Sequence, residues 1–453
     1  MGQLELPNLE RDGSVGMCTR DCLDGTDQPV ISVPASYCSA FDVTIIGASM
    51  PAATEPIQQP PAEKARRLRF LREGHTSSTR TAAPGAQTPV VLFIDSSAYL
   101  VGGTMHAMRN AAVGLQASGI LTQVLIPPSI NSQYIVSLFR NAGIDIRIAN
   151  ELRLSSKNTV YNVGRICRAI RESGATVVNI HSPGNHIPFT EVAAGRMAGK
   201  RVIVSVHHAV PFATSYQSRK SAAISHAVHG IIVGTQAMRA ILINAGVPPR
   251  RIHLVPYGIP TPERYPSQQE ARQRLNLPND PFIVGTLARL VAHKGVDDLI
   301  AVIKDIPHVW LIIGGAGPER DNLEKQAKNA SISERVTFLG RVNTTDDLYA
   351  ASDVFVLPSY EEGFGLVYIE AALHGIPGIG ARVGGVPEAI IDKETGLLIS
   401  PGNRHELFSA IQAVKNDPSL RRTLGNAARA RAKAQYTIDA MALGYRNVLF
   451  GLT

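Results

Sequence analysis

The chain has 453 residues, of which 44% are hydrophobic and 18% charged, a composition typical of soluble globular proteins. This length exceeds what one hydrophobic core usually holds, so two domains are expected. The net charge of +8 suits phosphorylated substrates or an anionic membrane surface. No aromatic–basic module typical of single-strand binders occurs, so we expect no nucleic-acid partner.

The sequence gives no sign of export or of a membrane span. The N-terminus carries acidic residues and no apolar stretch like that of a signal peptide, and no run of about 18 apolar residues occurs. The four cysteines lack the paired spacing of a zinc site: Cys18, Cys22, Cys38 and Cys167. We expect reduced cysteines and a cytoplasmic location.

Residues 1–88 differ from the rest of the chain. They are rich in Pro, Ser, Thr and Ala and show no clear helical or strand period, which predicts an irregular or disordered extension. Within it, residues 64–72 mix basic and apolar side chains. As an amphipathic helix this segment would attract acidic lipids, which makes it a candidate for peripheral contact at the inner membrane face. A solvated face or a linker is the alternative.

From Val90 onward, strands alternate with helix-length segments. Short apolar runs predict strands at 90–95, 122–126, 144–148, 177–181, 202–206 and 230–233, with a glycine loop at 101–104 and a helix from about 105 to 118. Such alternation predicts a parallel sheet with helices on both faces. We therefore predict a first Rossmann-like domain at 89–260, followed by a hinge in the proline-rich stretch 260–266.

A second domain of the same kind is predicted at 261–435. Its strands are expected at 282–284, 309–313, 336–339, 354–357 and 377–381. Together the two predicted domains make an α/β protein with two parallel sheets.

The segment after strand 354–357 carries the strongest chemical signal. A Gly-x-Gly turn at Gly363 and Gly365 leads into a helix-like run from Leu366, with Glu362 before it and Glu370 one turn into the helix. A helix N-terminus that follows a strand and a glycine turn binds anions, because its first N–H groups are unpaired and the helix dipole favours negative charge. We predict that phosphate binds at residues 363–366, that Glu370 accepts hydrogen bonds from a ribose diol, and that Glu362 faces a group beyond the phosphates. A solvated glutamate beside a plain tight turn is the alternative.

This segment resembles the Glu-x7-Glu motif of retaining family 4 glycosyltransferases (glycosyl transferases group 1), which have the GT-B fold. Three further regions are similar to motifs of that family, in the same order: 285–295, 311–318 and the closing elements 375–377, 384–388 and 395–398. The resemblance runs from about Val90 to the C-terminus. It implies two Rossmann-like domains facing across a cleft, with a helix at about 436–453 packing back on the first domain. At Tyr257 the family usually has Asn, so a hydrogen bond expected there is absent or replaced.

Two cations are expected to bind the donor diphosphate. Arg289 follows a strand at the edge where open α/β sheets bind ligands, and Lys294 lies five residues further on. Arginine can clasp phosphate with two bonds and lysine adds a compact charge. The resemblance assigns this pair to the same role. It also implies that Gly315 lies near the nucleobase, and that Gly103 faces the phosphates from the first domain.

The resemblance further implies that Glu362 binds hydroxyls of the donor sugar and is not a covalent nucleophile, with Phe364 and Gly365 shaping the sugar pocket. Retention of configuration would come from front-face attack, the leaving phosphate taking the acceptor proton. Four histidines end or follow predicted strands of the first domain: His181, His186, His207 and His208. The resemblance places a histidine near the donor sugar, with His207 the better match and His208 the alternative; a histidine satisfied by the backbone is the plain interpretation.

No metal or other cofactor is expected. The histidines have no cysteine partner at zinc spacing, and the adjacent Asp297 and Asp298 suit a helix N-terminus better than a metal site. The resemblance therefore implies a metal-independent retaining glycosyltransferase of polysaccharide-type pathways, which moves a hexosyl group from a nucleotide sugar to a glycan, lipid or small-molecule acceptor. Two alternatives stay open: a nucleotide-sugar epimerase of the same fold, and a catalytically silent partner of another transferase that binds nucleotide sugar.

Overall fold

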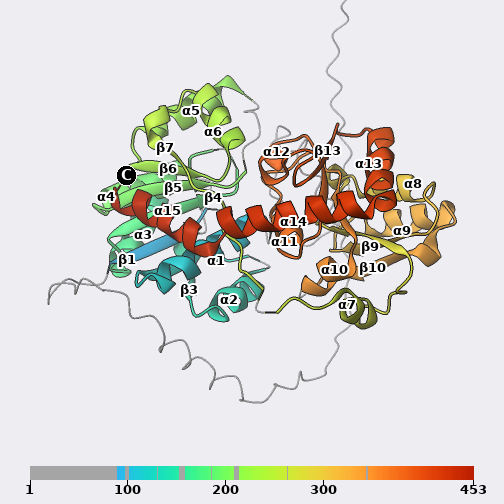
Figure 1. Ribbon diagram of the computed structural model, residues 1–453. Helices are drawn as coiled ribbons and strands as arrows, with labels where there is room; N and C mark the ends of the chain where they lie inside the picture. The colour runs from blue at the N-terminus through green and yellow to red at the C-terminus, as the bar shows by residue number, and fades with distance from the viewer. Residues whose placement is uncertain are drawn as a thin grey trace, which may run out of the picture. The chain divides into compact units, whose positions relative to one another are not determined.

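Figure 1 shows a computed structural model of the chain, which describes residues 89–96, 102–129, 131–152, 159–184, 186–208, 214–262, 264–342 and 345–452. The predicted extension 1–88, with segment 64–72 and three of the four cysteines, lies outside the described residues. The remaining cysteine, Cys167, is a buried free thiol.

The first sheet has seven parallel strands in the order β3-β2-β1-β4-β5-β6-β7. They are β1 (Val90–Asp95), β2 (Leu121–Ile126), β3 (Asp145–Ile148), β4 (Val177–Ser182), β5 (Arg201–Val206), β6 (Gly230–Val233) and β7 (Ile252–Leu254). Six of them match predicted strands. The edge strand β7 was not predicted, because its three residues are too few to show a strand period.

Helices cover both faces of this sheet (Figure 1). They are α1 (Gly103–Ala117), α2 (Ser132–Arg140), α3 (Thr159–Glu172), α4 (Phe189–Met197), α5 (Ser215–Ser225) and α6 (Gln236–Asn244). The central strand β1 shows why both faces need cover: Leu92 and Ile94 pack into one hydrophobic layer, and Val91 and Phe93 into the other. A strand buried on both faces is a continuous apolar run, as the sequence of β1 is.

The second sheet has six parallel strands in the order β10-β9-β8-β11-β12-β13. They are β8 (Phe282–Leu287), β9 (Val309–Gly314), β10 (Val336–Gly340), β11 (Val354–Leu357), β12 (Gly378–Ala381) and β13 (Gly396–Ile399). Around it lie α7 (Gln268–Arg274), α8 (Val296–Ile303), α9 (Arg320–Asn329), α10 (Asp346–Ala351), α11 (Leu366–Leu373), α12 (Val386–Ala389), α13 (Arg404–Asn416) and α14 (Pro418–Gln435). The edge strand β13 was not predicted as a strand, because Thr395 to Leu398 stood out only as a family motif.

The last helix, α15 (Ile438–Phe450), returns to the first sheet. The chain crosses at Tyr436, whose carbonyl accepts from the Ile259 N–H at 2.9 Å. Beyond the crossing, α15 packs on α1 so closely that a Cβ at Gly114 would lie 2.7 Å from the Ala442 Cβ. The domain limits of 89–260 and 261–435 remain predictions.

Two parallel-sheet Rossmann-like domains are thus present, which confirms the predicted fold class. None of the described helices is both long and apolar enough to cross a membrane.

Candidate active site

Two loops meet at the carboxyl edge of the second sheet. One follows β8 and carries the exposed Arg289 and the 3₁₀ turn Ala292–Lys294; the other follows β11. Gly295 has φ 66°, and a Cβ there would lie 2.4 Å from the Pro358 carbonyl oxygen, so only glycine allows this approach. The Tyr360 N–H also donates to the His293 carbonyl at 2.8 Å. The two loops are therefore fixed against each other.

This contact brings Lys294 to Glu362. The ammonium lies 2.9 Å from Glu362 Oε2, and both side chains are only 16% exposed. Lys294 also donates to the Glu361 carbonyl at 3.2 Å, and the Gly363 N–H donates to Glu362 Oε1 at 3.2 Å. A half-buried ion pair with a backbone N–H on the same carboxylate holds Glu362 in one orientation.

Arg289 lies in the same loop as Lys294, after β8. Burial, then the charges of Lys294 and Arg289, lower the pKa of the intervening His293. Among the described contacts, Arg289 has no side-chain hydrogen bond or ion pair, and its side chain is exposed. Its guanidinium is thus available to an anion beside Lys294.

The glycine turn has the geometry that the sequence predicted. Gly365 has φ 81° and is the N-cap of α11, which begins at Leu366. A second glycine pair is pressed against this turn: the Gly385 N–H donates to the Gly363 carbonyl at 2.8 Å, and a Cβ at Gly384 would lie 1.8 Å from the Glu362 carbonyl oxygen. The backbone before α11 is therefore held in place by contacts with Gly384 and Gly385.

Glu370 lies in the second turn of α11. The Tyr349 hydroxyl donates to Glu370 Oε2 at 2.6 Å, and burial raises the pKa of Glu370. Tyr349 was not predicted as part of the site; an apolar helix position gave no signal for it. The tyrosine orients the carboxylate that we expect to meet a ribose diol.

Of the two other predicted glycines, Gly315 lies at a close backbone approach and Gly103 at an ordinary van der Waals contact. Gly315, with φ 124°, follows β9, and a Cβ there would lie 1.8 Å from the Ala288 carbonyl oxygen. Gly103 begins α1, and a Cβ there would lie 3.8 Å from Leu366 Cδ1. The first turn of α1 therefore faces the first turn of α11, where phosphate is predicted.

The histidines separate into two environments. His207 is buried, and its Nε2 lies 2.8 Å from His181 Nδ1. His208 is half-buried beside the glycine turn, since a Cβ at Gly363 would lie 3.1 Å from His208 Cδ2. Burial lowers the pKa of His208, and the nearby Glu362 carboxylate opposes this shift. The ring of His208 thus lies near Glu362, whereas His207 is buried and its Nδ1 has no partner among the described residues. His186 lies on the loop after β4, and none of the described contacts links it to His207 or to His208.

Tyr257, at the position where the family usually has Asn, makes a hydrogen bond of its own. Its hydroxyl donates to the His207 carbonyl at 3.1 Å, and its ring contacts the His207 ring at 6.0 Å and the Phe364 ring at 5.4 Å between centroids. A Cβ at Gly234 would lie 2.2 Å from this ring, so the glycine makes room for the tyrosine. Tyr257 therefore connects the histidine strand to the turn before α11.

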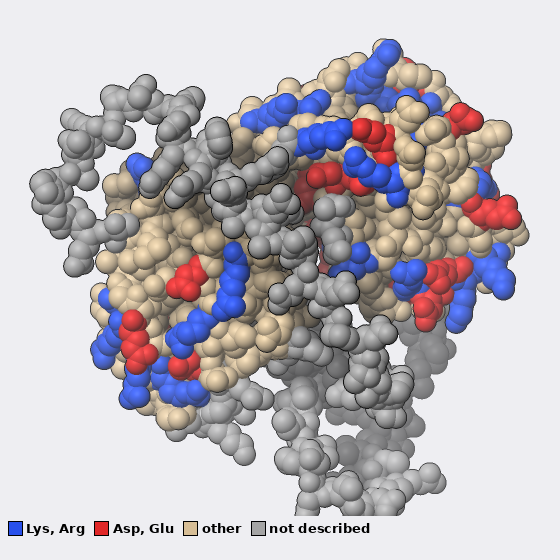
Figure 2. Space-filling model, turned by 90° about the horizontal axis from the view of Figure 1, so that it is seen from below, with Lys and Arg blue, Asp and Glu red and all other residues tan. Residues whose placement is uncertain are grey.

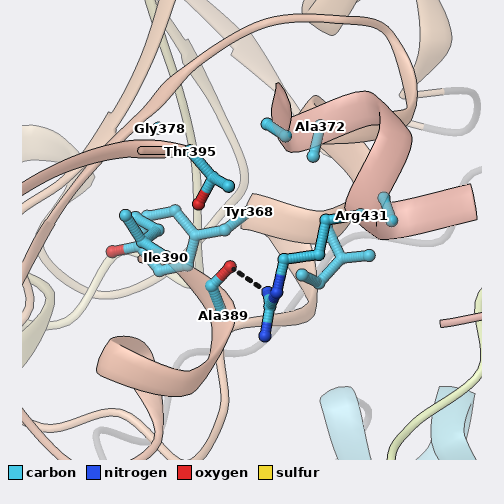
Figure 3. A pocket seen from close by; sticks show the side chains of 10 residues that line it. Tyr368, Ala372, Gly378, Ala389, Ile390, Thr395 and Arg431 are labelled. Carbon is cyan, nitrogen blue, oxygen red and sulfur yellow. Dashed lines mark hydrogen bonds between the residues drawn. The ribbon is translucent and has the colours of Figure 1, made fainter. Parts of the chain in front are cut away.

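Glu388 ends the family motif at 384–388, and no role was predicted for it. The Glu388 carboxylate accepts from the N–H groups of Gln236 and Ala237, at 2.8 and 3.0 Å, and so caps α6 of the first domain. The guanidinium of Arg431, on α14, donates to the Glu388 carbonyl at 2.7 Å and to the Ala389 carbonyl at 3.1 Å; Figure 3 shows the bond to Ala389. The enclosed cavity beside Arg431 measures about 10 Å³, which is too small for a nucleotide sugar.

No cluster of metal-ligating side chains occurs within the described residues. Asp298 instead accepts from the Tyr360 hydroxyl at 2.6 Å and pairs with Arg404. On the face drawn in Figure 2, basic and acidic side chains of the described residues are interspersed, without a single continuous basic surface.

Two family models together span most of the described chain. Residues 101–263 match Glycosyltransferase Family 4, and residues 267–431 match Glycosyl transferases group 1. A GDP-mannose-dependent alpha-(1-6)-phosphatidylinositol monomannoside mannosyltransferase of Mycobacterium tuberculosis is 30% identical over 280 residues, which cover 56% of this chain and 71% of that protein. The chain belongs to glycosyltransferase family 4.

Other family 4 relatives match over shorter segments. The lipopolysaccharide core biosynthesis glycosyltransferase LpsE of Rhizobium meliloti is 34% identical over 39% of this chain, which spans about half (52%) of that protein. Among solved structures, a glycosyltransferase from Rickettsia africae covers 81% of this chain and is itself 99% covered, with a TM-score of 0.70 and 17% identity. Anabaena HepE in complex with UDP covers 80%, is 99% covered, and has a TM-score of 0.69 and 22% identity. At these identities the structures show the GT-B fold alone.

Proposed function

We propose that this family 4 protein is a retaining, metal-independent glycosyltransferase, which moves a hexosyl group from a nucleoside-diphosphate sugar to a glycan, lipid or small-molecule acceptor. The observation that carries the proposal is the ion pair of Lys294 and Glu362 just before the N-terminus of α11, with Arg289 in the same loop as Lys294. This edge offers positive charge for a diphosphate and a fixed carboxylate beyond it.

The diphosphate leaves as the bond from the anomeric carbon to oxygen breaks, so its growing negative charge must be stabilised. The exposed guanidinium of Arg289, the ammonium of Lys294 and the free N–H groups of the first turn of α11 can do this without a metal ion. Glu370, one turn further along α11, is the acceptor for the ribose hydroxyls. Gly315 is proposed to lie near the base.

Glu362 is proposed to bind sugar hydroxyls. It accepts from Lys294 and from the Gly363 N–H, which fix its orientation, and its oxygens can accept further hydrogen bonds from hydroxyls. Phe364, Gly365 and Gly103 would line the sugar and phosphate pocket. His207, through Nδ1, and His208 are the first domain's candidates for contact with the sugar.

The relatives suggest acceptor classes. Their names include a phosphatidylinositol monomannoside acceptor, a lipopolysaccharide core and D-inositol 3-phosphate. These chemistries share a hydroxyl on a carbohydrate or cyclitol, often attached to a lipid. We propose an acceptor of this kind, with peripheral membrane contact through residues 64–72 and a location at the cytoplasmic face of the membrane.

The test is a product assay. The protein is incubated with UDP-, GDP- and ADP-hexoses, with and without EDTA, and released nucleotide and sugar are followed by NMR. Slow hydrolysis of one donor, unchanged by EDTA and giving the donor's own anomer first, supports a retaining transferase. Conversion of donor to another nucleotide sugar would favour an epimerase, and binding without turnover would favour a silent partner.

A further inference from the structure

A chain of hydrogen bonds runs through the interior of the first domain to His207. Its members are Ser205, Asn179 and His181, all buried, from the adjacent strands β5 and β4. The Ser205 hydroxyl donates to Asn179 Oδ1 at 3.0 Å, Asn179 Nδ2 lies 3.1 Å from His181 Nε2, and His181 Nδ1 lies 2.8 Å from His207 Nε2. None of these residues has a role in the function proposed above.

The amide of Asn179 sets the direction of every bond in this chain. Because its oxygen accepts from Ser205, its NH₂ group must donate to His181 Nε2. A neutral imidazole that accepts at Nε2 carries its proton on Nδ1, so His181 donates from Nδ1 to His207 Nε2. By the same rule, His207 carries its proton on Nδ1. The two rings are nearly coplanar, at 11°, as an in-plane N–H···N bond requires.

The last donor of the chain, His207 Nδ1–H, is buried and has no partner among the described residues. The His207 ring lies beside the candidate site, because it contacts Tyr257, whose ring contacts Phe364. The His207 carbonyl would lie 3.4 Å from a Cβ at Gly363. A buried donor without a partner costs stability unless a ligand satisfies it.

We propose that Asn179 and His181 are positioning residues that fix His207 as the Nδ1–H tautomer, so that His207 offers a hydrogen-bond donor, and no base, to a hydroxyl of the donor sugar. This inference rests on the proposed function for the identity of the ligand. The tautomer itself follows from the hydrogen-bond chain with the Asn179 oxygen directed at Ser205. Burial lowers the pKa of both histidines, that of His207 to about 3, so both stay neutral at neutral pH.

The opposite arrangement is chemically distinct. If the Asn179 amide were reversed, its oxygen would accept from His181 Nε2–H, and every bond would reverse. His207 would then carry its proton on Nε2, and its Nδ1 would be an acceptor able to act as a base. The two arrangements differ in one observable, the protonated nitrogen of His207.

Long-range ¹H–¹⁵N spectra of the ¹⁵N-labelled full chain distinguish them, with the His181→Gln and His207→Gln variants assigning the ring signals. The expected result is an Nδ1–H tautomer for His207, unchanged between about pH 5 and 8. An Nε2–H tautomer for His207 would overturn the proposal. This result does not depend on any enzymatic activity, so it is separate from failure of the proposed function.

The Asn179→Asp variant tests the positioning role. A carboxylate can only accept, so it should draw the proton of His181 to Nε2 and convert His207 to the Nε2–H tautomer, much as a buried aspartate sets the tautomer of a triad histidine. We expect kcat for donor hydrolysis to fall about tenfold, because His207 loses one hydrogen bond to the donor sugar. The KM for donor should stay within about twofold of the wild-type value. The exposed Asn322→Asp is the control. If Asn179→Asp switches the tautomer and keeps full kcat, Asn179 and His181 have no positioning role.

Discussion

The Lys294 ammonium lies 2.9 Å from the Glu362 carboxylate, so the two charges assigned to different parts of the donor neutralise each other. A diphosphate that binds Lys294 must share it with Glu362. The same pair fixes the Glu362 carboxylate at the place where the sugar is proposed. Under the proposed function, one contact would therefore set both phosphate affinity and sugar orientation.

Replacing Glu362 should separate these two effects. In Glu362→Gln, Lys294 loses its ionic partner, and the affinity for nucleoside diphosphate should rise about two- to fivefold, the worth of a modest ion pair. Transfer or donor hydrolysis should fall, because the amide binds sugar hydroxyls less well. Calorimetry measures the affinity for nucleoside diphosphate, and the product assay measures transfer or donor hydrolysis. The neighbouring exposed Glu361→Gln is the matched control, and a larger loss of transfer there would move the sugar role to Glu361.

Glu370 should act on the ribose alone. Glu370→Gln removes the carboxylate that Tyr349 orients, and nucleoside diphosphate affinity should fall about tenfold. Inorganic pyrophosphate has no ribose, so its affinity should be equal in both proteins. An equal loss for pyrophosphate would show that Glu370 supports the phosphate site instead.

Arg289 should act on the phosphates. Arg289→Ala removes a charge-assisted bond worth about 1.5–3 kcal/mol, which is about a 10- to 150-fold loss of nucleoside diphosphate affinity. The exposed Arg422→Ala on α14 lowers the net charge equally and should bind as the wild type does. Unchanged affinity in Arg289→Ala would refute the assignment.

Glu388 should hold α6 near the second sheet. Glu388→Ala leaves two N–H groups of α6 uncapped, at a cost of about 1 kcal/mol. Small-angle scattering should show a larger mean radius of gyration for this variant than for the exposed Glu394→Ala of the same region. Identical scattering curves would mean that other contacts hold α6.

Glu191 should give the fold a specific pH dependence. Burial raises the pKa of this α4 carboxyl to about 7, above its usual 4.5. Between these values the native state binds more protons than the unfolded state, so stability falls as pH rises from about 4.5 to 7, by about 3 kcal/mol. Glu191→Gln should remove that loss. Chemical unfolding at several pH values measures it, and parallel curves for both proteins would contradict the prediction.

Much of the fold was predictable because its central strands are buried on both faces. The run Val90–Asp95 and its counterparts are continuous apolar segments between helix-length stretches, and these fix a parallel sheet. The edge strand β7 was not predicted because it has only three residues, and β13 was not predicted because its segment stood out only as a family motif.

At the site, the glycine turn and its two glutamates were predictable because their spacing is local. The partners of those residues were not. Tyr349 contacts Glu370, and Tyr257 contacts His207, although each pair is separated in the sequence. Glu388 caps α6 from a segment still further along the chain. Only the fold brings these partners together. The same is true of His181 and His207, whose pairing depends on the register of β4 and β5.

The most direct test of the central claim is calorimetric titration of UDP-, GDP- and ADP-glucose, in EDTA, into the wild type and the Arg289→Ala, Lys294→Ala double variant. The account predicts that the wild type binds at least one of them without metal and that the double variant loses this binding. Equal binding by both proteins would contradict the claim that this edge of the second sheet holds the donor diphosphate.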